Sequence, residues 1–198
     1  MNYLFVRSHP YDGSWNVAAI KAMEEECKRK GYEVRETDLI ADGFDPVMRV
    51  EDIDAWRRHT YADPMVKGYQ EDVAWADVLV FVFPIWWGTM PAILKGYIDK
   101  VFLNEFAFVP SADGSMNGLL TDKKAIVVCT MQYPYEAWKK DGRFRDPVDS
   151  LVINLLCGDC GIECIGYKTF HQMSTTVKEH SGREITAKYI EECVQMIP

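Results

Sequence analysis

Three loops that follow predicted strands carry most of the side chains suited to binding a ligand. The first loop, SHPYDGSWN at residues 8–16, runs directly into a predicted helix. Unpaired amides and the dipole at a helix N-terminus favour a phosphate, and His9, Ser14 and Asn16 can add side-chain donors. The same residues also fit an ordinary strand-to-helix turn with a surface histidine. At this point a phosphate site and a simple turn both remain open.

The second loop, FPIWWGTMP at residues 83–91, places two tryptophans directly after a continuous apolar run. Burial of large aromatic side chains is favourable, so an exposed pair of tryptophans predicts a flat binding partner. One interpretation is a planar aromatic ligand lying against Trp86 or Trp87, with the backbone amides of residues 86–88 bonding its polar edge. The alternative is that one or both indoles pack in the core or in a dimer interface.

The third loop, TMQYPYEAW at residues 130–138, offers Gln132, Tyr133 and Tyr135. A tyrosine hydroxyl can donate a hydrogen bond to a developing oxyanion, and its ring can stack on a flat substrate. Tyr-Pro-Tyr is also an ordinary turn sequence, so this loop alone does not establish a catalytic role.

The cysteine spacing and the absent motifs argue against several other chemistries. Cys157, Cys160 and Cys164 form a C-x2-C-x3-C pattern, which lacks the second pair or the histidines that zinc sites usually add. We therefore expect buried thiols and no metal site. The chain has no G-x-S-x-G or H-E-x-x-H motif, and neither a G-x-G-x-x-G nor a Walker loop. The sequence therefore gives little support to a hydrolase or to a protein with one of the common nucleotide-binding motifs.

The elements that must position these loops alternate between strand and helix. Apolar runs predict strands, and spacings of three and four residues predict helices. The continuous run at residues 77–83 is typical of a strand covered on both faces, as in a parallel sheet. We expect one α/β domain over residues 1–198. The predicted strands are residues 2–8, 32–39, 77–83, 123–130 and 162–170. Two helices are predicted to begin at Trp15 and at Pro91. Four further helices are predicted over residues 51–58, 65–75, 148–156 and 184–196.

Two details of these helices follow from local chemistry. Ser14 or Asp12 is the expected cap of the first helix, and Gly31 should end it. Within it, Glu24, Glu25 and Glu26 precede basic residues by four positions, which predicts a solvated helix face. If the strand order is 2-1-3-4-5, the topological switch lies between the first and third strands, and a ligand should bind outside their carboxyl ends.

Composition restricts the partners. The 198 residues include 22 Lys plus Arg against 30 Asp plus Glu, a net charge of -8, with 48% hydrophobic residues. This charge argues against nucleic acid and anionic membranes, so an anionic ligand must be bound by local groups. No apolar run reaches the roughly 18 residues that a membrane span requires, and the N-terminus does not read as a signal peptide. We expect a cytoplasmic protein with reduced thiols and no membrane insertion.

One long segment carries a family resemblance. Residues 76–108, ADVLVFVFPIWWGTMPAILKGYIDKVFLNEFAF, resemble the hallmark segment of the NAD(P)H:quinone oxidoreductases, which include DT-diaphorase and smaller bacterial relatives. SHPYDGSWN, DLIADGFDPVMRVED at residues 38–52 and LLCGDCGIECIG at residues 155–166 extend the resemblance. It implies a flavodoxin-like α/β three-layer sandwich with a five-stranded parallel sheet in the order 2-1-3-4-5.

The resemblance also implies an activity. Members of the family are flavin enzymes, usually homodimers, that take a hydride from NAD(P)H and pass it to a quinone or a similar flat electrophile. Both FMN and FAD remain open as the flavin. Matched by position, the cofactor-binding residues are His9, Ser14, Trp15 and Asn16 at the phosphate, Pro84, Ile85, Trp86, Trp87 and Gly88 along the ring, and Thr130 and Gln132 in the third loop.

Where the family usually has a Gly-Gly pair, this chain has Gln132 and Tyr133. Tyr133 and Tyr135 are the candidates that stand in for the family's catalytic side chains. A second hypothesis is a flavin-binding regulatory subunit of an ion-transport system, and a third is a thiol or metal module at Cys157, Cys160 and Cys164.

Overall fold

The computed structural model describes residues 1–134, 149–173 and 182–198. Within these ranges the main sheet consists of β1 (Asn2–Arg7), β2 (Glu33–Asp38), β3 (Val78–Pro84), β6 (Lys124–Thr130) and β7 (Glu163–Phe170). All neighbours pair in parallel, in the order β2-β1-β3-β6-β7. This is the predicted 2-1-3-4-5 order, with two short strands of a separate hairpin inserted in the numbering.

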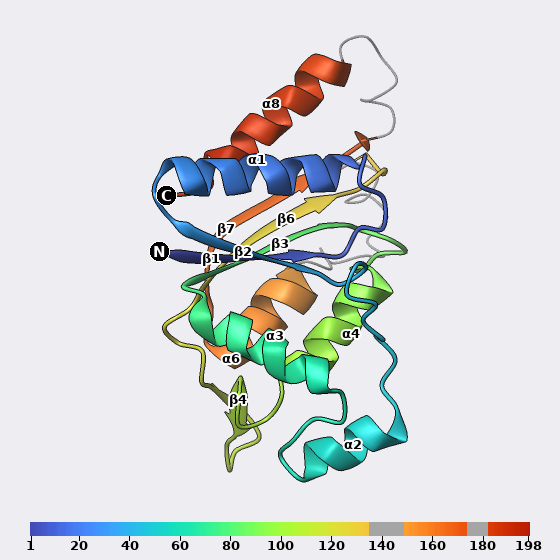
Figure 1. Cartoon of the computed structure of the whole chain (residues 1–198), viewed down its shortest axis with the longest axis vertical. Helices are drawn as coiled ribbons and strands as arrows, with labels where there is room; N and C mark the ends of the chain where they lie inside the picture. The colour runs from blue at the N-terminus through green and yellow to red at the C-terminus, as the bar shows by residue number, and fades with distance from the viewer. Residues whose placement is uncertain (135–148, 174–181) are drawn as a thin grey trace.

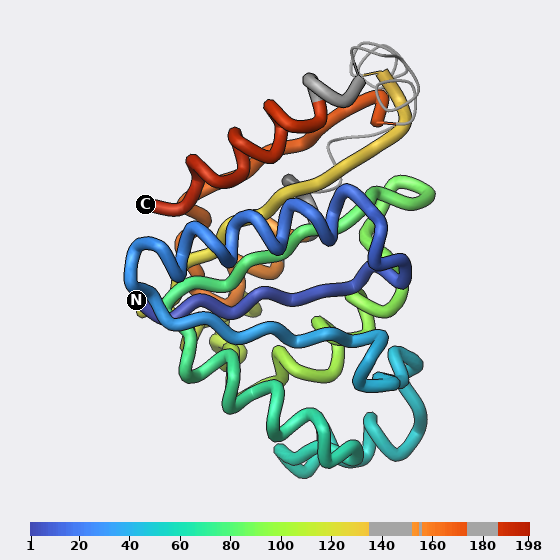
Figure 2. Tube along the Cα trace, turned by 45° about the horizontal axis from the view of Figure 1, so that its top comes forward, coloured from blue at the N-terminus to red at the C-terminus, as the bar shows by residue number. Residues whose placement is uncertain are grey.

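Helices cover both faces of this sheet (Figure 1). On one face lie α1 (Trp15–Arg29) and α8 (Gly182–Val194), which run side by side in Figure 2. On the other face lie α3 (Pro64–Trp75), α4 (Ala92–Val101), η1 (Asp149–Cys157) and the short α6 (Gly158–Cys160). The helix α2 (Val50–Arg57) sits farther from the sheet, beyond α3 and α4. The predicted three-layer sandwich is confirmed.

Strand alternation divides the core into two layers. Along β1, Leu4 and Val6 belong to the layer under α3 and α4, whereas Tyr3 and Phe5 belong to the layer under α1. Successive side chains of a strand point to opposite faces, so one strand supplies both layers. Every residue of β3 is buried, which confirms the prediction of a strand covered on both sides.

The first helix begins and ends where its local chemistry predicts. The Ser14 hydroxyl accepts a hydrogen bond from the Val17 amide at 3.2 Å, so Ser14, rather than Asp12, is the cap. After the helix, Gly31 adopts a φ of 76°, a left-handed conformation that glycine tolerates and that ends the helical hydrogen-bonding pattern.

Several boundaries differ from the sequence-based expectations. Pro91 is the residue before α4 rather than its first helical position. The helix expected over 148–156 is a π-helix over Asp149–Cys157. The predicted last helix begins two residues earlier, at Gly182. An antiparallel hairpin of β4 (Phe108–Pro110) and β5 (Met116–Gly118) was not predicted, because three-residue strands are too short to show alternation.

Candidate active site

The three loops singled out from the sequence meet at one edge of the sheet. They follow β1, β3 and β6, whose carboxyl ends lie together at the right-hand edge in Figure 1. The ring centroids of His9 and Trp86 are 5.9 Å apart, which joins the first loop to the second. The Ile85 amide donates to the Thr130 carbonyl at 2.7 Å, which joins the second loop to the third. This is the switch-point edge at which ligands of open α/β sheets bind.

The N-terminus of α1 offers amides to an anion. The Val17 amide bonds the Ser14 hydroxyl and the Ala18 amide bonds the Ser14 carbonyl at 3.1 Å. Among the described residues, the amides of Trp15 and Asn16 have no hydrogen-bond acceptor. Two unpaired amides at the positive end of a 15-residue helix suit a phosphate group.

One ring nitrogen of His9 is held by its own loop, which leaves the other ring nitrogen as the donor. Its Nδ1 accepts a hydrogen bond from the Tyr11 amide at 3.1 Å. A neutral imidazole that accepts at Nδ1 carries its hydrogen on Nε2. Partial burial lowers the pKa of His9, so the ring is neutral at pH 7 and Nε2 is the donor.

Two side chains of this region point elsewhere. The Asn16 amide group contacts the Thr130 hydroxyl at 3.1 Å, and both side chains are buried between α1 and β6. The Trp15 indole donates to the Thr186 carbonyl at 3.2 Å and packs edge-on against Phe170. The expected side-chain donor at Asn16 therefore holds α1 against the sheet, and Trp15 and Asn16 offer a ligand their backbone amides.

The two tryptophans form a tight reverse turn. Trp86 and Thr89 exchange backbone hydrogen bonds of 2.9 and 3.1 Å. Between them, Trp87 and Gly88 have φ values of 51° and 81°, and positive φ at both central residues defines a type I′ turn. The Trp86 amide is thus already used inside the turn, which corrects the expectation that it faces a ligand. The amides of Trp87 and Gly88 have no acceptor in the described part of the chain.

The turn exposes its indoles. Trp86 is 44% exposed and Trp87 is fully exposed, so within this chain neither indole packs in the core. The preceding Pro84 is the last, buried residue of β3, and Ile85 is half-buried beside it. The second loop therefore presents two aromatic surfaces and two unpaired amides on a rigid strand end.

The third loop is anchored to β7. The Met131 amide donates to the Phe170 carbonyl at 2.9 Å, and the Met131 carbonyl accepts from Met173 at 3.2 Å. Gln132 and Tyr133 are exposed, and the Tyr133 carbonyl lies 3.3 Å from Nδ1 of His171. Tyr135 lies outside the described residues. The catalytic roles assigned to Tyr133 and Tyr135 remain predictions.

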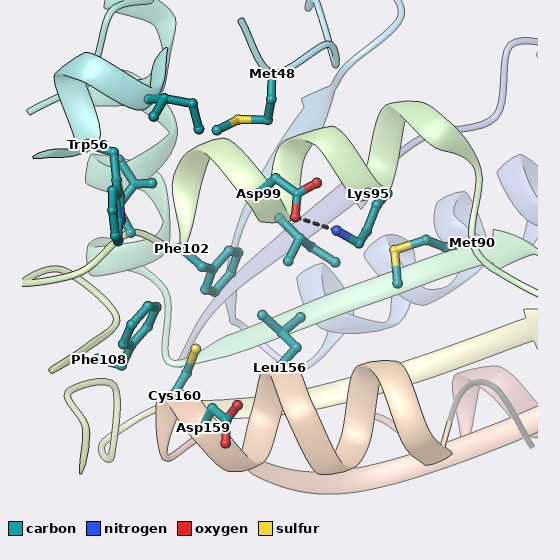
Figure 3. A pocket seen from close by; sticks show the side chains of 13 residues that line it. Met48, Trp56, Met90, Lys95, Asp99, Phe102, Phe108, Leu156, Asp159 and Cys160 are labelled. Atoms are coloured by element: carbon teal, nitrogen blue, oxygen red, sulfur yellow. Dashed lines mark hydrogen bonds and ion pairs between the residues drawn. The ribbon is translucent and has the colours of Figure 1, made fainter. Parts of the chain in front are cut away.

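A groove adjoins the second loop on the α4 face of the sheet (Figure 3). It has a volume of about 480 Å³, and its wall is mainly apolar. Met90, directly after the tryptophan turn, lines one end, and Lys95 pairs with Asp99 along α4. The remaining labelled lining residues are Met48, Trp56, Phe102, Phe108, Leu156, Asp159 and Cys160. This groove was not predicted from the sequence, although Ile53 and Trp56, three residues apart on α2, both line it.

The cysteines near the groove are protonated thiols. Cys157 and Cys160 are buried, and burial raises the pKa of each to about 12. Metal binding requires thiolates, which these surroundings disfavour. The burial predicted for these thiols is confirmed, except that Cys164 is only half-buried. No grouping of three metal-ligand side chains occurs in the part of the chain that the structure describes.

None of the helices described by the structure is both long enough and apolar enough to cross a membrane.

Comparison with known proteins settles the family. A sequence profile for the flavodoxin-like fold matches residues 1–195. The chain belongs to this family. A Haemophilus influenzae protein named as an uncharacterized NAD(P)H oxidoreductase is 28% identical over 171 residues, which span 86% of this chain and 83% of that protein. The NAD(P)H dehydrogenase [quinone] 1 of Cavia porcellus is 32% identical over 64% of this chain, and the match spans about half, 52%, of that longer relative.

Solved structures agree with the family assignment. A protein from Streptococcus mutans is 28% identical, with a TM-score of 0.85 over 98% of this flavodoxin-like chain and all of that one. The relatives from Haemophilus influenzae and Cavia porcellus are named as an NAD(P)H oxidoreductase and an NAD(P)H dehydrogenase (quinone), which agrees with the oxidoreductase activity that the sequence resemblance implied. They give no support to the ion-transport alternative.

Proposed function

We propose that this chain is a flavin-dependent NAD(P)H oxidoreductase that passes a hydride from NAD(P)H to a quinone or a similar flat electrophile. One observation carries the proposal: the unpaired amides of a helix N-terminus and an exposed tryptophan turn lie at the same switch-point edge. A phosphate and a flat ring are the two chemical parts that this pair of features can bind. FMN and FAD share both parts, so the proposal covers either.

The residues present fit a flavin. The Ser8 hydroxyl, at the end of β1, is completely buried and has no hydrogen-bond partner among the described residues. A buried polar atom without a partner is costly, and at a ligand edge it is explained by a group that arrives with the ligand. The open amides of Trp15, Asn16, Trp87 and Gly88 are four further donors for that ligand.

Each part of the site then has a physical task. When bound, the flavin supplies the hydride chemistry. The α1 amides and Nε2 of His9 bind the phosphate, and the amides of Trp87 and Gly88 donate to the polar edge of the ring. The Trp86 indole, which packs against the His9 ring, would cover part of the flavin ring and exclude water there. The exposed Tyr133 would contact the quinone at the opening of the site. Tyr135 follows it two residues later in the sequence.

The exposed apolar surface beside the groove supports a homodimer. On α2, Val50 is 72% exposed, Ile53 40% and Trp56 43%. Large apolar side chains gathered beside an apolar groove are typical of an interface. We propose that a second copy of this chain covers them.

We also propose that the chain is a single domain and that it acts in the cytoplasm. Residues 1–198 form one domain, because α1 and α8, from opposite ends of the chain, pack against the same face of one sheet. The protein acts in the cytoplasm, because the buried cysteines Cys27, Cys157, Cys160 and Cys193 carry free thiols, as a reducing compartment favours.

The decisive test is cofactor uptake followed by turnover. Purified protein is titrated with FMN and FAD and then mixed with NAD(P)H and a soluble quinone. We expect flavin binding, quenching of tryptophan fluorescence and quinone-dependent oxidation of NAD(P)H. Replacing His9 by Ala should weaken FMN binding, whereas His59→Ala, at a surface histidine outside this site, should not. Protein that takes up neither flavin would contradict the proposal.

A further inference from the structure

Arg7 connects the phosphate loop to the sheet. It is the last residue of β1, and its side chain is 12% exposed. Its Nη1 lies 3.0 Å from Oδ2 of Asp38 and 3.7 Å from Oε1 of Glu36, both on β2. Its Nη2 pairs with Asp12, in the middle of the loop.

The strand contacts fix the guanidinium before the loop engages it. An arginine is always charged, so a nearly buried one is held in place by its acidic partners. Asp38 and Glu36 occupy one nitrogen, and the planar geometry then sets the direction of the other. A pre-oriented arginine loses little side-chain entropy on pairing, so its bond to Asp12 should be stronger than that of an ordinary surface pair.

Asp12 depends on this contact for its position. Its side chain is 81% exposed, so burial does not hold it. The rest of the loop is tied within itself, by the Tyr11 amide on Nδ1 of His9 and by the Ser14 amide on the Tyr11 carbonyl at 3.0 Å. The Arg7–Asp12 pair therefore attaches a self-bonded loop to the rigid end of the strand.

We propose that Arg7 and Asp12 are positioning residues that clamp the loop in the conformation that binds the flavin phosphate. The clamp touches no ligand atom. It acts by holding His9 and the start of α1 in place relative to each other. This inference rests on the proposed flavin function.

The clamp and simple charge counting predict opposite effects of removing the Asp12 charge on FMN affinity. Asp12 is an anion beside a phosphate site, so on charge alone its removal should strengthen FMN binding. If its task is to hold the loop, the same removal weakens FMN binding, because the ordered loop must then form when the ligand binds.

The experiment measures dissociation constants for FMN and riboflavin in Asp12→Asn, Arg7→Gln and the double variant. Riboflavin has the same ring but no phosphate. We expect each single variant to raise the dissociation constant for FMN roughly tenfold and to leave that for riboflavin unchanged. The double variant should be no weaker than either single one, because both remove the same contact.

Matched controls separate the clamp from a general loss of stability. Arg35 and Asp72 form an arginine–aspartate pair at 2.7 Å away from the loop, between β2 and α3, so Arg35→Gln and Asp72→Asn should leave both affinities unchanged. Arg7→Gln leaves Asp38 and Glu36 without their cation, whereas Asp12→Asn keeps that contact, so the test stands on Asp12→Asn if Arg7→Gln does not fold.

The outcomes distinguish this inference from the proposed function. Hydrogen exchange of the loop amides, measured without flavin, should accelerate in Asp12→Asn. Unchanged or tighter FMN binding in that variant would overturn the clamp, as would an equal loss for riboflavin. If the unaltered protein binds no flavin at all, the proposed function fails, while the exchange rates still report on whether the Arg7–Asp12 pair orders the loop.

Discussion

Glu24 illustrates how a single residue can depart from its local pattern. The run of Glu24, Glu25 and Glu26 predicts a solvated helix face, yet Glu24 turns inward and is only 9% exposed. It meets Glu36 of β2, while Lys28 and Lys21 approach from its own helix. Burial, followed by the neighbouring Glu36 carboxylate, raises the pKa of Glu24 to about 7. The prediction of a solvated face is wrong at this position, because β2 packs against that side of α1.

This raised pKa predicts a pH-dependent stability. An unfolded glutamate titrates near 4.5, so the native state holds the proton more tightly. The stabilisation is complete below pH 4.5 and is lost as the pH rises from 4.5 to about 7. Glu24→Gln, which mimics the protonated form, should therefore raise the free energy of unfolding at pH 8 by about 2 kcal/mol and change it little at pH 4.5.

Urea unfolding at pH 4.5, 6, 7 and 8 measures this difference. Glu25→Gln, on the exposed side of the same helix, is the control and should shift stability by less than about 0.5 kcal/mol. A Glu24→Gln variant whose stability parallels that of the unaltered protein at every pH would show that the carboxyl is not held protonated.

At the scale of elements, α4 approaches the segment before α2 through a glycine. A Cβ added at Gly96 would lie inside van der Waals contact with the Cα, Cβ and carbonyl oxygen of Pro46. Backbone atoms cannot move aside as a flexible side chain can. We expect Gly96→Ala to lower the free energy of unfolding by roughly 1–3 kcal/mol, measured by chemical unfolding.

A helical glycine in open space provides the matched control. A Cβ added at Gly68 on α3 would meet nothing within 4 Å beyond its chain neighbours and the backbone of its own helix. Gly68→Ala should therefore stabilise the protein by about 0.5–1 kcal/mol, because alanine has less conformational freedom to lose. Equal effects of the two substitutions would contradict the close approach between α4 and Pro46.

The tryptophan turn stores strain at the proposed flavin edge. Trp87 has a φ of 51° and is fully exposed, so it bears a left-handed conformation without gaining burial within the chain. Asn-Gly is the preferred sequence for this turn. Trp87→Asn should raise the free energy of unfolding by roughly 1 kcal/mol while weakening FMN binding. Calorimetry measures the stability and fluorescence titration measures the FMN affinity. A variant with unchanged FMN affinity would show that Trp87 is not part of the flavin site.

At the scale of the whole molecule, the proposed dimer predicts a change in sedimentation. The unaltered protein should sediment as a dimer at micromolar concentration, and Trp56→Lys should shift it toward monomer because a lysine charge must be desolvated in the interface. Leu119→Lys, at a residue 44% exposed outside the groove lining, is the control and should remain dimeric. Monomers at all concentrations in the unaltered protein would contradict the proposed interface.

Much of the fold was predictable because its signals are local. The Ser14 cap, the Gly31 stop and the buried run of β3 each depend on residues close together in sequence. The strand order required the family resemblance, because periodicity does not say which strands become neighbours. The β4–β5 hairpin was missed because its strands are too short to carry a period.

Local sequence patterns were enough to predict that three loops rich in aromatic and polar groups follow the strands of a parallel sheet, and that they lack a nucleophile motif and a recognisable metal motif. Which groups of these loops are already hydrogen-bonded within the protein depends on the tertiary fold. Asn16 turns to Thr130, more than a hundred residues away, and Trp15 turns to Thr186. The physical reason is that a buried polar group must find a hydrogen-bond partner, and which partner is within reach depends on contacts between distant segments that no local pattern records.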